Sequence, residues 1–304
     1  MEKRLTRTDY LIATLTIFML VCVLGAFFIG FKIGKDRTDK QWQQVATQEA
    51  KANSQIQSYD QQQLALFYHS IYIPYKNFQS KWFQTEDELG RNSQTVNSAN
   101  AVKDLVKLAD SIQKELQDKS MPENSPLLQQ ASSHYQTSLQ SFNKGLQSFV
   151  AKANSMPGTD LIHAMSVDAQ LQEAKKSALT AQKEYYTSIV KWQQSNNPKA
   201  ASKSLDSTKK ISFEEWNTSN IHMKNEYIAT LMLQSGSYSE YLPHDMTARI
   251  DELLAKGEMQ NLGISDVPAA VQLLNGTNAV RTDYFTKLKA KYAQETLPNV
   301  PFFQ

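Results

Sequence analysis

The feature that most constrains this chain is an uncharged segment near its start, from Tyr10 to Phe31. A helix of these 22 residues would be about 33 Å long, enough to cross the hydrocarbon core of a bilayer. A cleaved signal peptide has a shorter apolar region, whereas this run continues beyond the small residues Gly25 and Ala26. We therefore predict an uncleaved transmembrane signal anchor over residues 10–31, with the lipid bilayer as its partner.

Basic residues on both sides of this segment leave its orientation almost undetermined by charge. Those before it are Lys3, Arg4 and Arg7, and those just after it are Lys32, Lys35, Arg37 and Lys40. The numbers of basic residues on the two sides are therefore nearly equal, and the positive-inside rule does not decide the orientation. The chain beyond the segment contains no cysteine, which suits an oxidising exterior. We expect residues 1–9 to form a short cytoplasmic head and the bulk of this single-pass protein to be extracytoplasmic, at the cell membrane.

The same segment carries a stripe of small residues at intervals of four. These candidate membrane-helix pairing residues are Cys22, Ala26, Gly30 and Gly34. A small-residue stripe lets two membrane helices approach closely, and the last two glycines form a GxxxG motif. Small residues are also common in membrane helices that do not pair, so both interpretations stay open.

The rest of the sequence is typical of long helices. Only 10 glycines and 9 prolines occur in 304 residues, which argues against a turn-rich β sandwich or barrel. Apolar residues recur at spacings of three and four through most of the chain. We predict an all-α fold with an elongated antiparallel helical bundle over residues 64–296. A helical stalk over residues 32–63, with a spacing that also suits a short coiled coil, would join it to the anchor, and an apolar tail over residues 297–304 would follow it.

The breaks between apolar stripes predict the individual helices. A helix should begin at Pro126, and the next should run without interruption from Thr159 or Asp160 to about Gln194. Because their connection is short, these two helices should form an antiparallel hairpin. Further helices are predicted over residues 213–233, 245–255, 267–274 and 277–294.

One helix stands out for its aromatic side chains. Between residues 64 and 83 they recur at helical spacing, and Pro74 should kink or break the helix near Tyr72 and Ile73. A ligand pocket at the kink is the functional interpretation, and an ordinary core face of a bundle is the simpler one. The candidate ligand-binding residues are Tyr68, Tyr72, Tyr75 and Trp82.

One polar loop also contains aromatic residues, with a histidine next to an aspartate. It spans residues 235–245, and its candidate site residues are Tyr238, Tyr241, His244 and Asp245. Loops held by rigid helices often carry function. The alternative is an ordinary connection in which Asp245 helps to cap the next helix.

The sequence contains no motif for catalysis, a cofactor or a metal. HExxH, GxSxG, the P-loop and GxGxxG are all absent, and the five histidines form no i,i+3 or i,i+4 pair. We predict no catalytic residues, no cofactor and no metal site. The 32 basic and 30 acidic residues nearly balance, which argues against nucleic acid as a partner.

These patterns favour a non-catalytic protein. The leading hypothesis is a membrane-anchored, extracytoplasmic helical scaffold or interaction module at the cell envelope, with a protein partner or self-association. An alternative is a sensory or small-ligand-binding domain, which would need a membrane partner because its interior head has only nine residues. An envelope enzyme is the third hypothesis.

Overall fold

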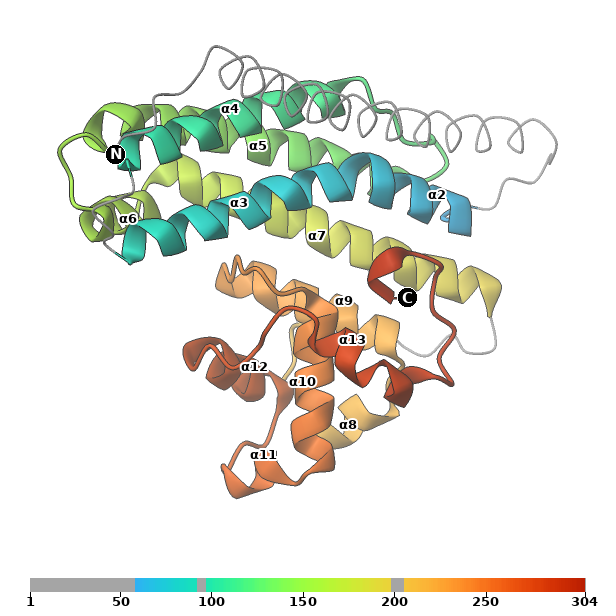
Figure 1. Ribbon diagram of the computed structural model, residues 1–304. Coiled ribbons are helices and arrows are strands. Elements are labelled where there is room, and N and C mark those ends of the chain that lie inside the picture. The colour runs from blue at the N-terminus through green and yellow to red at the C-terminus, as the bar shows by residue number, and fades with distance from the viewer. Residues whose placement is uncertain (1–57, 92–96, 198–204, 304) are drawn as a thin grey trace, which may run out of the picture. The chain divides into compact units, whose positions relative to one another are not determined.

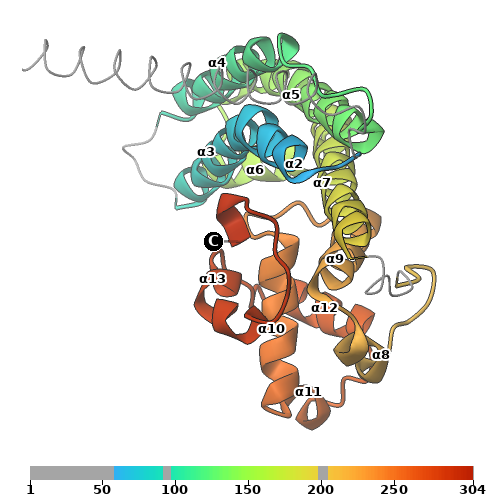
Figure 2. The same ribbon diagram turned by 90° about the vertical axis from the view of Figure 1, so that its right-hand side faces the viewer.

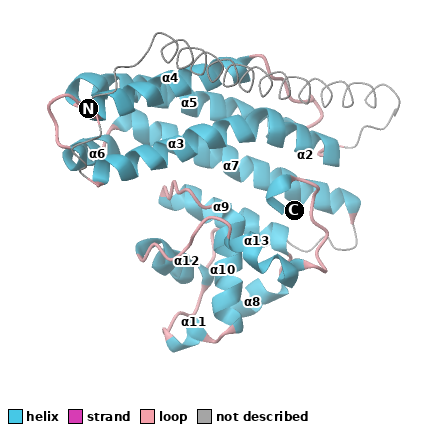
Figure 3. Cartoon of the chain, in the orientation of Figure 1, coloured by secondary structure: helices cyan, strands magenta, loops and turns pink. Residues whose placement is uncertain are grey.

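The computed structural model describes residues 58–91, 97–197 and 205–303. All secondary-structure elements in these ranges are helices (Figure 3). The all-α prediction is therefore confirmed for this part of the chain. None of the helices described is both long enough and apolar enough to cross a bilayer. The predicted anchor over residues 10–31, with its four pairing residues, lies outside the described ranges, as does most of the stalk over residues 32–63.

The first long helix consists of three continuous parts: α2 (Gln61–Phe67), a π-helical turn η1 (Tyr68–Tyr72) and α3 (Ile73–Gly90). The wider turn stands where a kink or break was predicted. Pro74 has no N–H to donate, and its ring crowds the preceding turn. The π turn relieves this crowding, and the Ile73 N–H donates to the carbonyl of Tyr68. The aromatic stripe therefore continues through the irregularity without a break in the helix.

Three further long helices lie beside the first: α4 (Ser98–Gln117), α5 (Pro126–Lys152) and α7 (Ala169–Asn196) (Figures 1 and 2). The most extensive contact joins α5 and α7. Ser138 of α5 lies opposite Ala174, and Gly145, further along α5, lies against the earlier residue Leu171. Partners that run in opposite directions confirm the predicted antiparallel hairpin.

The sequence predicted that the second helix of the hairpin runs unbroken from Thr159 or Asp160. This prediction was wrong. A short helix α6 (Gly158–Ser166) ends before α7 begins. Asp168 caps α7, with its side chain accepting the N–H of Leu171 at 3.0 Å. The break was missed because the apolar spacing continues across it. Only the capping side chain of Asp168 marks the start of a new helix.

The remaining helices form a second group, beside α7 in both views (Figures 1 and 2). They are α8 (Phe213–Thr218), α9 (Ile221–Ser235), α10 (Pro243–Ala255), α11 (Glu258–Asn261), α12 (Val267–Gly276) and α13 (Tyr284–Leu288), with 3₁₀ turns η3 (Lys289–Tyr292) and η4 (Pro301–Phe303). Helix α9 packs along α7, and α10 packs on α9 and α13. Residues of this group surround a core of their own that includes Trp216, Tyr227, Met246 and Ile250.

Two helix predictions in this group were wrong. The helix expected over residues 213–233 is divided at Asn220, whose side chain accepts the N–H of Met223 at 3.1 Å and so caps α9. The helix expected over residues 277–294 is reduced to α13 and η3. Asn278 and Asp283 have left-handed φ values of 51° and 69°, which a helix interior does not allow.

The apolar end of the chain folds back onto the helices. We refer to residues 297–303 as the C-terminal strap. Val300 is 0% exposed and Phe303 is 2% exposed, so the strap contributes to the core. The predicted apolar tail therefore docks on the helices.

Candidate functional site

The four aromatic candidates of the first helix lie in different surroundings. Trp82 is fully buried in the bundle, with its ring centroid 4.8 Å from that of Phe142. Tyr72 and Tyr75 line an enclosed cavity of only about 10 Å³, the space of roughly one water molecule. Burial raises the pKa of the Tyr72 phenol well above its usual value. Tyr68 lies at a larger opening, the cleft described below.

The four loop candidates also separate. Tyr238 turns toward the bundle, where its hydroxyl lies 3.0 Å from that of Tyr75. Tyr241 turns the other way and donates its hydroxyl to the side chain of Asn275. His244 and Asp245 lie in the first turn of α10. The structure thus joins the two predicted groups at Tyr75 and Tyr238, which are distant in sequence.

The aromatic candidates of the first helix and the loop candidates also meet at a cleft of about 240 Å³. We call it the strap cleft because Phe302 of the C-terminal strap forms one wall. The other residues that line it come from η1, α3, α10, α13, η4 and the segments before α10 and α13: Tyr68, Lys76, Glu240, Leu242, His244, Asp245, Thr282, Asp283, Thr286 and Pro301. Ionisable groups of both signs therefore converge at one place.

Asp245 uses both carboxylate oxygens on the backbone. One accepts the Leu242 N–H at 3.0 Å, and the other accepts the Phe285 N–H at 3.1 Å. The first bond supports the start of α10, as the capping interpretation predicted, and the second fixes the start of α13. The carboxylate is therefore a structural clamp, with each of its two oxygens holding one backbone N–H.

His244 is a buried, neutral imidazole. Its Nδ1 lies 2.7 Å from the Tyr186 hydroxyl, and its ring stacks on Phe302 at 5.0 Å and an angle of 9°. Burial lowers the pKa of His244 to about 4, and the charge of Lys76 acts in the same direction. Burial also raises the pKa of Tyr186 well above 10, so this hydroxyl is a poor nucleophile at neutral pH.

Lys76 was not recognised from the sequence. Its Nζ donates to the carbonyl of Glu240 at 2.6 Å and to Gln79 Oε1 at 3.1 Å. Burial lowers the pKa of Lys76, while the carboxylates of Asp245 and Asp283 act in the opposite direction. A lysine between the apolar positions of a helical stripe is the signal that the sequence offers. The spacing does not show which groups its ammonium contacts.

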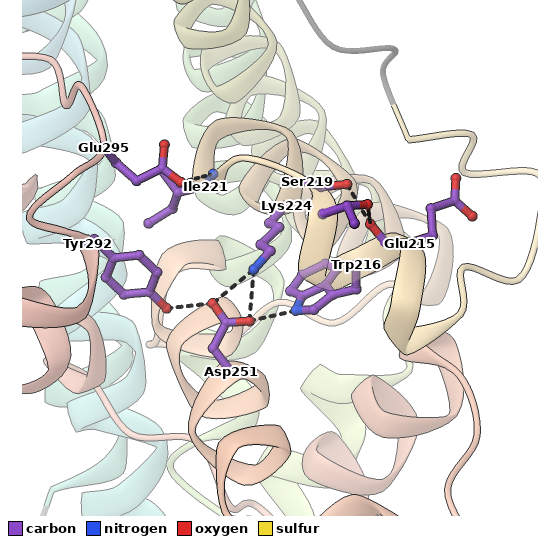
Figure 4. A network of polar contacts seen from close by, with 9 residues as sticks. Glu215, Trp216, Ser219, Ile221, Lys224, Asp251, Tyr292 and Glu295 are labelled. Atoms are coloured by element: carbon purple, nitrogen blue, oxygen red, sulfur yellow. Dashed lines mark hydrogen bonds and ion pairs between the residues drawn. The ribbon is translucent and has the colours of Figure 1, made fainter. Parts of the chain in front are cut away.

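A second polar network lies within the C-terminal helices (Figure 4). Asp251 of α10 accepts hydrogen bonds from Trp216 Nε1 at 2.6 Å, from the Tyr292 hydroxyl at 2.8 Å and from Lys224 Nζ at 3.1 Å. The side chains of Lys224 and Asp251 are only 10% and 12% exposed. The network therefore joins α8, α9, α10 and η3 through one carboxylate.

The sequence did not predict this network either. Lys224 Nζ lies 5.2 Å from the centre of the Trp216 ring, so the ammonium is held by an aromatic face as well as by Asp251. Nearby, the side chain of Glu295 accepts the N–H of Ile221 at 3.3 Å (Figure 4). Every contact in Figure 4 links two helices or completes a helix end, which indicates a structural role.

Within the described ranges, no group of three or more histidine, cysteine, aspartate or glutamate side chains is placed to hold a metal ion. No family model, curated protein or solved structure matches this chain. The candidate site is therefore defined by its geometry alone, and the strap cleft is where the predicted residues and the charged groups converge.

Proposed function

We propose that this chain is a membrane-anchored, extracytoplasmic interaction module that acts by binding a protein partner or itself, without catalysis. The uncharged segment over residues 10–31 supports the anchor. The observation that carries the proposal is the tie between the two ends of the described domain. Gln61, the first residue of α2, pairs with Asn299 of the strap. This pair fixes the strap against the first turn of α2, so both ends of the described domain are held and its helices remain available as a surface for a partner.

The state of the ionisable groups supports binding rather than catalysis. Both oxygens of Asp245 hold backbone N–H groups, and Asp251 is surrounded by three side-chain donors. The hydroxyl beside His244 belongs to a buried tyrosine whose pKa is raised. An activated nucleophile needs a base next to a group that gives up its proton readily, and this pair does not offer one.

Membrane orientation can be tested by thiol labelling in intact cells. Cys22→Ala removes the only cysteine, and single cysteines are then placed at Lys3 or at the exposed Lys107 of α4. A membrane-impermeant maleimide should label Lys107→Cys in intact cells and Lys3→Cys only after permeabilisation. The opposite pattern would overturn the extracytoplasmic placement.

Interaction can be tested by site-specific photo-crosslinking in the membrane. A photo-reactive residue is placed in turn at exposed positions of α4, such as Lys103 and Lys107, and at exposed positions of the C-terminal helices. We expect one face to give a discrete adduct of constant mass, either with a second copy or with one partner. Absence of a discrete adduct from every face would contradict the interaction proposal.

Binding of a small ligand is the second candidate function, and the strap cleft is the observation that favours it. Its volume of about 240 Å³ is far larger than the 10 Å³ cavity at Tyr72 and Tyr75. The cleft also contains charged groups and aromatic walls, a combination typical of sites that orient a small molecule.

A further inference from the structure

The floor of the strap cleft presents a hydrogen-bond donor from His244. A buried tyrosine hydroxyl needs an acceptor, and His244 Nδ1 is the acceptor within reach of Tyr186, at 2.7 Å. When Nδ1 accepts, the neutral ring carries its proton on Nε2. Nε2 has no hydrogen-bond partner in the described part of the chain, although His244 is only 4% exposed and lines the cleft. The Nε2 atom is not fully buried, so its N–H is open to the cleft, where water or a ligand can accept it.

Lys76 provides a second donor at the same floor. An ammonium has three N–H groups, and two of those on Lys76 are used by Glu240 O and Gln79 Oε1. Lys76 forms no ion pair with any carboxylate in the described ranges. The third N–H and the positive charge are therefore available, and together with His244 they suit a carboxylate.

The rim of the cleft has the opposite character. Glu240 and Asp283 are exposed, and their carboxylates have no hydrogen-bond or ion-pair partner in the part of the chain described. With Lys76 and Asp245 included, the lining carries one positive and three negative formal charges. A simple anion would be repelled by this excess, and a simple cation would leave the donors of the floor without acceptors.

The walls and the volume limit the size of the ligand. The rings of Tyr68 and Phe302 lie 5.4 Å apart and offer apolar surface to an alkyl group. The cleft volume of about 240 Å³ is more than twenty times that of the one-water cavity at Tyr72 and Tyr75, which leaves room for a small organic molecule. A molecule of that size with one carboxylate and one ammonium group is a small amino acid.

We propose that the strap cleft binds a free amino acid as a zwitterion. The carboxylate lies between His244 Nε2 and Lys76 Nζ, the ammonium group faces Glu240 and Asp283, and the apolar part lies against Tyr68 and Phe302. This inference deepens the second candidate function and is independent of the membrane orientation. Because Phe302 belongs to the strap, the ligand would also hold the strap in place.

The test is isothermal titration of the full-length chain in detergent with glycine, L-leucine, L-glutamine and L-lysine. At least one free amino acid should bind. Its N-acetyl and methyl ester derivatives should bind at least about tenfold more weakly, because each leaves buried or charged groups unmatched. Failure of all four to bind, or equal binding of either derivative, would overturn the proposal.

Variants assign the two ends of the ligand separately. Lys76→Gln should weaken binding about tenfold and reduce the preference for the free acid over its methyl ester. The double variant Glu240→Gln, Asp283→Asn should instead reduce the preference for the free amine over its N-acetyl form. A merely structural role would weaken all ligands alike and would contradict the assignment.

Two controls keep these measurements interpretable. Lys209→Gln removes an exposed lysine that pairs with Asp206 and does not line the cleft, so it should leave affinity unchanged. Circular dichroism and melting of each variant show whether it is folded. The labelling and crosslinking experiments remain informative when no amino acid binds, so the two proposals can fail separately.

Discussion

The Gln61 side chain and the Asn299 backbone form a reciprocal pair of hydrogen bonds. Gln61 Nε2 donates to the Asn299 carbonyl at 3.1 Å, and the Asn299 N–H donates to Gln61 Oε1 at 2.9 Å. The amide thus substitutes for a neighbouring peptide group and ties the C-terminal strap to the first turn of α2. Phe302 and Phe303 then pack beyond this tie, against His244 and Phe285.

The first prediction concerns this tie. Gln61→Ala should lower the free energy of unfolding by about 1 kcal/mol, because two exposed hydrogen bonds are lost and water replaces both. Limited proteolysis should cleave the strap faster in this variant. Gln61→Glu is the matched control: it keeps an acceptor for the Asn299 N–H and should have about half the effect. Equal protease resistance in all three proteins would show that the strap does not depend on the pair.

The second prediction is a loss of stability in mild acid. Two buried histidines contact the C-terminal segment: His222 Nε2 donates to the carbonyl of Thr296, just before the strap, at 2.7 Å, and His244 stacks on Phe302 of the strap. Burial lowers the pKa of each to about 4, compared with an ordinary value of 6.5. The folded state therefore binds fewer protons than the unfolded state, and stability falls as pH decreases from about 6.5 to about 4.

The expected loss is on the order of 3 kcal/mol per histidine once the pH approaches 4. Urea unfolding at pH 7.5, 6, 5 and 4 measures it. His222→Gln should reduce the dependence on pH, whereas His163→Gln, at an exposed position of α6, should leave it unchanged. A pH profile that is the same in both variants would contradict the assignment.

The third prediction concerns the buried ion pair. Asp251→Ala should lower the free energy of unfolding by about 3–5 kcal/mol, because it leaves the buried Lys224 ammonium without its counter-charge. Tyr292→Phe should cost about 1 kcal/mol, the value of a single hydrogen bond to this network.

Chemical denaturation with circular dichroism checks both values. Asp206→Asn, which breaks an exposed ion pair with Lys209, is the control and should cause no measurable change. The double variant Lys224→Met, Asp251→Leu should recover much of the lost stability, because neither charge then remains buried. A double variant as unstable as Asp251→Ala would assign the loss to packing instead.

The main helices could be predicted from the sequence because helical periodicity is a local property. The helix predicted to begin at Pro126 is α5, whose buried apolar residues keep a helical spacing from Leu128 to Phe149. The break between α6 and α7 and the break between α8 and α9 were missed, because the caps at Asp168 and Asn220 start a new helix without disturbing that spacing.

The candidate site could be predicted only in part. Tyr68, His244 and Asp245 were named from local composition, but the sequence does not place one beside another. Lys76 and Asp251 were missed because a sequence does not show whether a charged residue is buried or exposed to solvent. Their positions follow from contacts between segments far apart in the chain, which local spacing does not encode.

The fourth prediction concerns the close contact between α6 and the end of α3. A methyl group added at Gly158 would lie 2.3 Å from the backbone carbonyl oxygen of Leu89, an atom that cannot move without shifting α3. Gly158→Ala should therefore lower the free energy of unfolding by about 1–3 kcal/mol, the usual effect of overpacking.

Gly276→Ala is its matched control, because nothing lies within 4 Å of the added methyl group at the end of α12. It should be neutral or should raise stability by about 0.4–1 kcal/mol, since alanine restricts the unfolded chain more than glycine does. Thermal melting of the two variants side by side separates the steric effect from the backbone effect. If Gly158→Ala were as stable as Gly276→Ala, α6 would not be packed tightly against the end of α3.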